Sequence, residues 1–376
     1  MTSETVSRTS TFPFAELPLV PLIQVIRFMS VQERINVALS SCQMEHLVEL
    51  ARVRSSCHYI SIKDEKSYIQ LEISGSDRNF LYFDTRKDAV NITGNELWKW
   101  FGKRCSNQNI AMVYHRIQNL FPSPNLVLHF HLDRMQGSSI QTLLSHPSFM
   151  NWTTLLVVGD RIDIEDFNLI MSTASMERSI FINVQSMPES CAHEKVFQFR
   201  NIEFHGAHWF RIENLFALRN CDRVVLSLNQ INFNHLNQLL RYWMKCDYCM
   251  FRQLTIYIEG LFQFLPNQVF KDVSYLSTSR RGYPEFLILS SSYKTLKFPV
   301  AVVPGIESAF KIATVSSIGD YAQEYEILKT LESLKYLKEE LKNSARAPKQ
   351  LEQEIRVHMR KLEQMNVQLV NGNIFM

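Results

Sequence analysis

Cysteine and histidine are the residues of this chain whose spacing first suggests chemistry. Cys246 and Cys249 form a CxxC pair, the spacing with which two thiolates bind one zinc ion. A structural zinc site needs four ligands, and the sequence holds no second CxxC. His205 and His208 would complete the site only if the fold brought them close. We therefore expect both cysteines to pack as small hydrophobic residues rather than to bind metal.

A second candidate metal site lies on a predicted strand. His129, His131 and Asp133 alternate along the chain, so their side chains would share one face of a sheet. Two imidazoles and a carboxylate can hold a metal, although we favour an ordinary polar sheet face. The sequence contains no GxSxG, GxGxxG, Walker or HExxH motif. We predict that the protein is not an enzyme and uses no cofactor.

The composition is that of a globular chain large enough to bury its own core. Of the 376 residues, 46% are hydrophobic and 20% are charged. With only 11 glycines, the chain is poorly suited to glycine-rich phosphate loops. The 40 basic and 37 acidic residues leave a net charge of +3, which predicts no nucleic-acid partner. Seven cysteines without regular spacing favour a reducing compartment, the cytoplasm or the nucleus.

The N-terminal region contains no predicted membrane segment. Residues 1–11 include seven serines and threonines and read as a disordered tail. The apolar stretch 17–29 is interrupted by Pro18, Pro21, Gln24 and Arg27, so it cannot span a bilayer. We predict that the protein does not bind a membrane.

Residues 12–56 are predicted to form a small helical module. Leu22, Val25, Ile26 and Met29 recur at i, i+3, i+4 and i+7, which gives one apolar stripe. Ser30 and the glutamate three residues later have the capping-box spacing, so a second helix begins there. A module this small cannot bury all of its apolar surface, and the excess predicts a docking surface or a contact with the next domain.

The central region predicts an α/β domain. Residues 57–125 read as connecting strands and helices, and 126–303 as alternating strands and helices around a mainly parallel sheet. Segments 155–171 and 224–240 align without gaps, which favours an irregular leucine-rich-like repeat. An ordinary α/β domain with coincidental similarity is the alternative. The predicted strands are Leu126–Leu132, Leu155–Val158, Ile180–Val184, Val196–Phe199, Val224–Leu228, Leu254–Ile258 and Phe286–Leu289.

Residues 304–376 are predicted to form two amphipathic helices separated at Pro348. Their leucine stripes could dimerise the protein as a coiled coil. We favour packing on the chain's own domain, because neither side of the proline holds three clean heptads.

The N-terminal module resembles an F-box. The resemblance rests on Leu17-Pro18, the apolar stripe, the Ser30–Glu33 turn and the second helix ending in Ser40-Ser41-Cys42. Further along, Trp209, Val224–Leu228 and the helix Leu236–Trp243 resemble the type-2 F-box-associated domain.

The resemblance implies the substrate-recognition subunit of a Skp–cullin–F-box ubiquitin ligase. Its module would bind a Skp-type adaptor and thereby the cullin ligase core, and its α/β domain would bind an unknown substrate protein. The alternative is a non-ligase interaction scaffold with a degenerate F-box, altered at Pro21 and Ile23. The adaptor contacts implied are Leu17, Pro18, Leu22, Val25, Ile26, Met29, Ile35 and Leu39.

Substrate-binding residues are expected just after the predicted strands, because rigid scaffolds carry binding residues on their loops. These residues are Asp160, Arg161, Asn229, Gln230 and Glu259. The alternative is that Asp160 and Asn229 only form turns.

Overall fold

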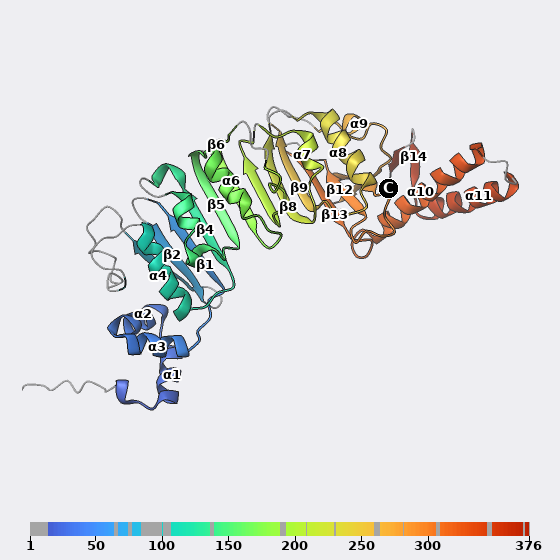
Figure 1. Cartoon of the computed structure of the whole chain (residues 1–376). Helices are drawn as coiled ribbons and strands as arrows, with labels where there is room; N and C mark the ends of the chain where they lie inside the picture. Colours follow the sequence, from blue (N-terminus) through green and yellow to red (C-terminus); the bar gives the residue numbers. More distant parts are fainter. Residues whose placement is uncertain are drawn as a thin grey trace, which may run out of the picture. The chain divides into compact units, whose positions relative to one another are not determined.

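The computed structural model (Figure 1) contains two compact units, Met1–Leu155 and Leu156–Met376. Each unit is mixed α/β, as predicted. The predicted tail, 1–11, lies outside the described residues. The structure describes residues 14–63, 67–73, 77–83, 100, 107–135, 139–188, 193–207, 209–228, 231–258, 264–280, 282–305, 309–343, 348–370 and 373–375.

The first unit begins with a helical module. A 3-10 turn, η1 (Phe14–Glu16), precedes α1 (Leu19–Phe28), α2 (Val31–Ser40) and α3 (Cys42–Leu50). The predicted capping box is confirmed: Ser30 Oγ accepts from the Glu33 N–H at 3.3 Å, and the Ser30 N–H donates to the Glu33 carboxylate at 2.7 Å. Pro21 fits because it stands in the first turn of α1, where N–H groups have no partners within the helix.

A small sheet completes the first unit. The strands are β1 (Cys57–Ile62), β2 (Ser67–Ile73), β3 (Asp77–Phe83) and β4 (Leu126–His131), in the order β4-β1-β2-β3. Only β1 and β4 are parallel; the β1–β2 and β2–β3 pairs are antiparallel. Helix α4 (Asn107–Leu120) contributes the fully buried Tyr114 to the core. The remaining short elements are η4 (Leu132–Arg134), α5 (Ile140–Leu144) and η5 (Pro147–Phe149).

The second unit opens with strands and helices in alternation. Strands β6 to β9 are all parallel, as the sequence predicts. The predicted strand 196–199 is wrong: this segment forms a turn, and the strand begins at Asn201. The elements in order are β5 (Thr154–Arg161), α6 (Ile164–Ser172), β6 (Ser179–Ser186), β7 (Asn201–His205), α7 (Ile212–Leu215), β8 (Cys221–Leu228), α8 (Phe233–Lys245) and β9 (Phe251–Ile258).

Beyond β9 the sheet is largely antiparallel, which corrects the prediction of a mainly parallel sheet for this part. Strand β13 lies between β9 and β12 and is antiparallel to both. No described helix separates β10 from β11 or β11 from β12, and strands joined this way can pair antiparallel. The elements are α9 (Pro266–Val269), β10 (Leu276–Arg280), β11 (Tyr283–Leu289), β12 (Val300–Pro304), β13 (Phe310–Val315), β14 (Gln368–Val370) and β15 (Asn373–Phe375).

Two long helices, α10 (Ala322–Asn343) and α11 (Pro348–Gln364), follow β13, with the proline break where it is predicted. Leu334 of α10 and Leu362 of α11 share one core cluster with Leu276 and Leu287 of the sheet. The two leucine stripes therefore pack within their own unit.

Candidate functional site

The helical module is held together by a buried arginine. Arg34 is only 6% exposed, and its guanidinium donates to the carbonyls of Ile26 at 2.8 Å and Arg27 at 2.7 Å. Those carbonyls belong to the last turn of α1, where carbonyls lack the usual i+4 partner; the Ile26 carbonyl also accepts from the Met29 N–H at 3.2 Å. A cation at this end also interacts favourably with the helix dipole. Arg34 thus fixes the angle between α1 and α2, a role that no spacing pattern in the sequence indicates.

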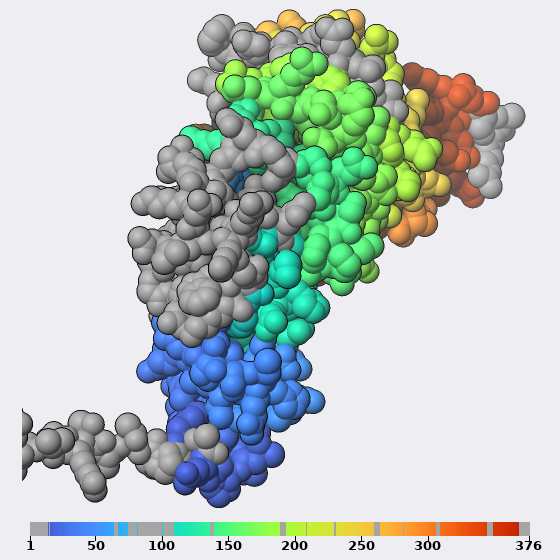
Figure 2. Space-filling view, turned by 60° about the vertical axis from the view of Figure 1, so that its left-hand side comes forward, coloured from blue at the N-terminus to red at the C-terminus, as the bar shows by residue number. Residues whose placement is uncertain are grey.

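The module is also anchored to the rest of its unit. Arg27 Nε donates to the Ala51 carbonyl at 3.0 Å, which joins α1 to the end of α3. Glu45 of α3 pairs with Arg116 of α4 at 2.6 Å. Figure 2 shows the module as a blue lobe with α4 in cyan beside it. The surface that remains available is the side of α1 turned away from these contacts.

The stripe predicted for adaptor contact is largely the inner face of the module. Leu22 is 3% exposed and Ile26 0%, and Ile35 and Leu39 of α2 are also buried. Leu17 and Met29 are half-buried, while Pro18 is exposed. Of the stripe on α1, only Val25 is exposed, at 40%. Four of the eight residues therefore hold the helices together and are not accessible to a partner in this arrangement.

The outer face of α1 is apolar as well. Val20 is 69% exposed and Phe28 is 89% exposed, and these two residues stand eight positions apart on one side of the helix. Val25 extends the same surface, which we call the outer α1 face (Val20, Val25 and Phe28). Leu19 is 53% exposed, but it stands three and seven positions before Leu22 and Ile26 and therefore on the side of the buried stripe. A large exposed apolar side chain such as Phe28 indicates an interaction surface when its exposed neighbours are also apolar. The sequence pattern did not single out Leu19, Val20 or Phe28.

A second candidate surface is the polar face of the parallel strands in the second unit. Asn201, Arg223 and Gln253 are register partners on β7, β8 and β9. On this face Thr255 is half-exposed and Tyr257 is exposed, and Val225 is buried among them. Most of the alternate residues of the same strands are buried, although Arg252 is exposed. We call this surface the polar sheet face (Asn201, Glu203, His205, Arg223, Ser227, Gln253, Thr255 and Tyr257).

A connected hydrogen-bond series lies at the centre of the polar sheet face. His205 contacts Ser227 Oγ through Nδ1 and the Glu203 carboxylate through Nε2, each at 2.9 Å. Arg223 lies 3.7 Å from the other Glu203 oxygen. A Ser–His–Glu series can activate a serine nucleophile, but the N–H groups of these strands already pair in the sheet and are not free to form an oxyanion hole. The series instead holds the three side chains in fixed positions on this face.

The residues predicted for substrate contact are described only in part. Asp160 and Arg161 are exposed at the end of β5, and Asp160 accepts from Gln185 at 2.9 Å. Asn229, Gln230 and Glu259 lie outside the described residues. The last residues of β8 and β9, Leu228 and Ile258, are register partners, so these two strands end side by side.

The two candidate metal sites have the following surroundings. His129 and His131 have ring centroids 4.0 Å apart, and His129 Nδ1 hydrogen-bonds the Tyr59 hydroxyl. Burial lowers the pKa of His129 to about 4, so this ring is neutral at neutral pH. Cys246 and Cys249 are free thiols, and His208 lies outside the described residues. Within the described part of the chain, no three His, Cys, Asp or Glu side chains are placed to hold a metal ion together.

Comparison with known proteins gives one distant relative. No protein-family profile matches the chain, and no solved structure matches it. An uncharacterized protein of Caenorhabditis elegans is 19% identical over 239 residues, which cover 57% of this chain. The match spans 53% of that relative, about half its length. In the part of the chain that the structure describes, no helix is long and apolar enough to cross a membrane.

Proposed function

We propose that this chain is the substrate-recognition subunit of a Skp–cullin–F-box ubiquitin ligase. Its helical module binds a Skp-type adaptor, and its second unit binds a substrate protein. The other subunits of the ligase carry out ubiquitin transfer, so the chain itself needs neither a catalytic residue nor a cofactor. Such a receptor acts in the cytoplasm or the nucleus, without nucleic acid or membrane as a partner.

The observation that carries the proposal is the outer α1 face. Leu22 and Ile26 are buried in the core of the module, whereas the side chains of Val20 and Phe28 are 69% and 89% exposed. Burying one such side chain contributes about 1.5–3 kcal/mol, so a partner that covers this face gains several kcal/mol. The apolar surface lies on a helix whose orientation Arg34 fixes, which lowers the entropic cost of binding.

The polar sheet face supports the receptor half of the proposal. Glu203, His205 and Ser227 are held in place by one another, so they meet a partner without losing much side-chain entropy. Tyr257, 43% exposed, adds the aromatic surface on which protein interfaces concentrate their binding energy.

The test is binding of the full chain to a purified Skp-type adaptor. Val20→Glu combined with Phe28→Glu places two charges on the outer α1 face without touching the module's core. We expect adaptor affinity to fall by at least about a hundredfold, because both contacts are lost and two charges face an apolar partner. Ile318→Glu combined with Val357→Glu is the matched control, since these side chains are 83% and 58% exposed elsewhere.

The competing function is the interaction scaffold that does not join a ligase. Absence of adaptor binding by the folded wild-type chain would establish the scaffold and overturn the ligase proposal. Adaptor binding that survives the double charge substitution would place the contact away from α1.

A further inference from the structure

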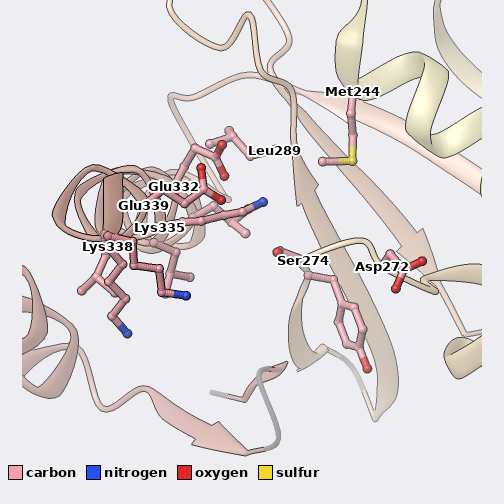
Figure 3. Close-up of a pocket in the computed structure, with 13 residues that line it drawn as sticks. Met244, Asp272, Ser274, Leu289, Glu332, Lys335, Lys338 and Glu339 are labelled. Carbon is pink, nitrogen blue, oxygen red and sulfur yellow. The ribbon is translucent and has the colours of Figure 1, made fainter. Parts of the chain in front are cut away.

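Two pockets of the second unit differ in the charges that line them. The pocket in Figure 3, of about 380 Å³, lies between α10 and the sheet. Three lysines and three carboxylates line it, so charge alone does not select a ligand for it: Asp272, Glu332, Lys335, Lys338, Glu339 and Lys342. The other pocket is a groove of about 480 Å³ where β7, β8 and β9 begin beside the end of β13.

This groove is continuous with the polar sheet face. Asn201, Arg223 and Gln253 belong to both surfaces, as register partners on β7, β8 and β9. Ala313 of β13 is the register partner of Gln253. A segment bound on the polar sheet face therefore adjoins the groove. We call it the arginine groove (Asn201, Asp222, Arg223, Arg252, Gln253, Ala313, Thr314 and Val315).

The carboxylates at the arginine groove are already paired. Asp222, the one carboxylate in the lining, accepts from Arg200 Nε at 2.7 Å. Glu203 of the polar sheet face hydrogen-bonds His205 at 2.9 Å, and its other oxygen lies 3.7 Å from Arg223. Neither carboxylate neutralises Arg252.

Arg252 has no ion pair and no side-chain hydrogen bond among the described residues. Its guanidinium lies 4.8 Å from the centroid of the Phe298 ring, and Lys297 Nζ lies 5.4 Å from the same centroid. An aromatic ring attracts cations but carries no net charge, so both positive charges persist. Lys311, two residues before Ala313 on β13, also has no ionic partner in the described part of the chain.

The arginine groove therefore carries a surplus of positive charge. The two carboxylates, Asp222 and Glu203, stand against five cations: Arg200, Arg223, Arg252, Lys297 and Lys311. The lining also holds an unused neutral donor, because the Gln253 amide has no hydrogen-bond partner among the described residues. Guanidinium and amide N–H groups are the donors that carboxylate oxygens accept from.

We propose that the arginine groove binds a carboxylate of an acidic substrate segment that lies on the polar sheet face. Arg223 and Arg252 contact the carboxylate, since each guanidinium offers two parallel N–H groups that fit its two oxygens. A nucleic-acid backbone or a doubly charged phosphoryl group fits less well, because its additional negative charge meets Asp222 and Glu203. The inference rests on the proposed function and identifies the class of substrate segment.

The experiment measures fluorescence anisotropy of a short labelled peptide that carries four glutamates among glycines and serines. The full-length chain is expected to bind it. Arg223→Gln combined with Arg252→Gln is expected to weaken binding at least about tenfold, because two exposed charge contacts are lost. Affinity should fall as salt is raised, because both arginines are exposed.

The matched control is Arg356→Gln combined with Arg360→Gln. These two exposed arginines of α11 remove the same charge from the same unit, and their loss should leave affinity unchanged. A second variant, Gln253→Glu, keeps both arginines and adds a carboxylate to the groove at an exposed position. It should also weaken binding at least about tenfold.

Three comparison ligands decide the chemistry. The same peptide with glutamines in place of the glutamates should not bind. No binding of the glutamate peptide, or wild-type affinity in the double arginine variant of the groove, would overturn the inference. Tighter binding of a phosphoserine peptide or of oligothymidylate than of the glutamate peptide would also overturn it.

Adaptor binding is measured on the same samples, so the two proposals can fail separately. Normal adaptor binding without peptide binding would remove only the inference about the arginine groove. Peptide binding without adaptor binding would remove the ligase function and leave a receptor for acidic segments.

Discussion

Replacing Arg34 with alanine tests how the outer α1 face is held in place. The guanidinium is 6% exposed and donates to two carbonyls at 2.8 and 2.7 Å. A hydrogen bond to a charged group contributes about 1.5–3 kcal/mol, so two contribute about 3–6 kcal/mol. Water reaches the freed carbonyls in the variant and recovers part of this. We expect Arg34→Ala to make local opening of the module easier by about 3 kcal/mol.

Hydrogen exchange on the full-length chain measures this change directly, since it reports local opening segment by segment. A loss of about 3 kcal/mol raises exchange of protected amides in 19–50 by roughly a hundredfold. Strands of the second unit should exchange as before. Arg34→Lys keeps one charge but not the two-pronged donor geometry, and should fall between the wild type and Arg34→Ala.

The control is Arg54→Ala, which removes an exposed arginine a few residues beyond α3. It should leave exchange of the module unchanged. If Arg34→Ala left protection of α1 and α2 as it is in the wild type, Arg34 would not be the residue that orients α1.

Three further predictions concern the first unit. Ser30→Ala removes the cap of α2 and should lower its stability by about 1 kcal/mol, seen as faster exchange at the start of that helix. Leu22→Ala combined with Ile26→Ala leaves cavities inside the module and should lower its free energy of unfolding by about 2–5 kcal/mol per site. Circular dichroism and hydrogen exchange should therefore show unfolding of 19–50, so a loss of adaptor binding in this variant would follow from unfolding and not from a lost contact. Burial lowers the pKa of His58 from 6.5 to about 4, so acidification protonates the unfolded chain first, and the stability of this unit falls as pH drops from about 6.5 to 4. His58→Gln should flatten that slope in denaturant unfolding; an identical slope would contradict the assignment.

Local features were predictable because their causes are local. The Ser30–Glu33 capping box depends only on residues three positions apart, and it is present. The amphipathic helix α8 and the two C-terminal helices follow from spacings of three and four. The parallel pairing of β6 to β9 follows from the connecting segments that carry the chain back across the sheet.

Features that depend on distant partners were not predictable. Strand β13 lies between β9 and β12, although more than forty residues separate it from β9 in the sequence. An apolar run in a sequence does not reveal the direction of the strand or which strand it pairs with. Segment 196–199 is as apolar as a strand, yet Val196, Phe197 and Phe199 are buried in a turn. A hydrophobic segment can be buried without pairing with a strand, and its hydrophobicity alone does not show whether it pairs.

The candidate site shows the same division. Sequence alone predicted that α1 carries more apolar surface than a small module can bury, and that two amphipathic helices separated at Pro348 lie in 304–376. Only the tertiary structure decided that Leu22 and Ile26 face inward while Val20 and Phe28 face outward. Both faces of α1 are apolar, so the choice depends on where α2 and α3 pack and on the carbonyls that Arg34 reaches across the turn. Periodicity gives a helix its faces, and contacts between elements decide which of them is buried.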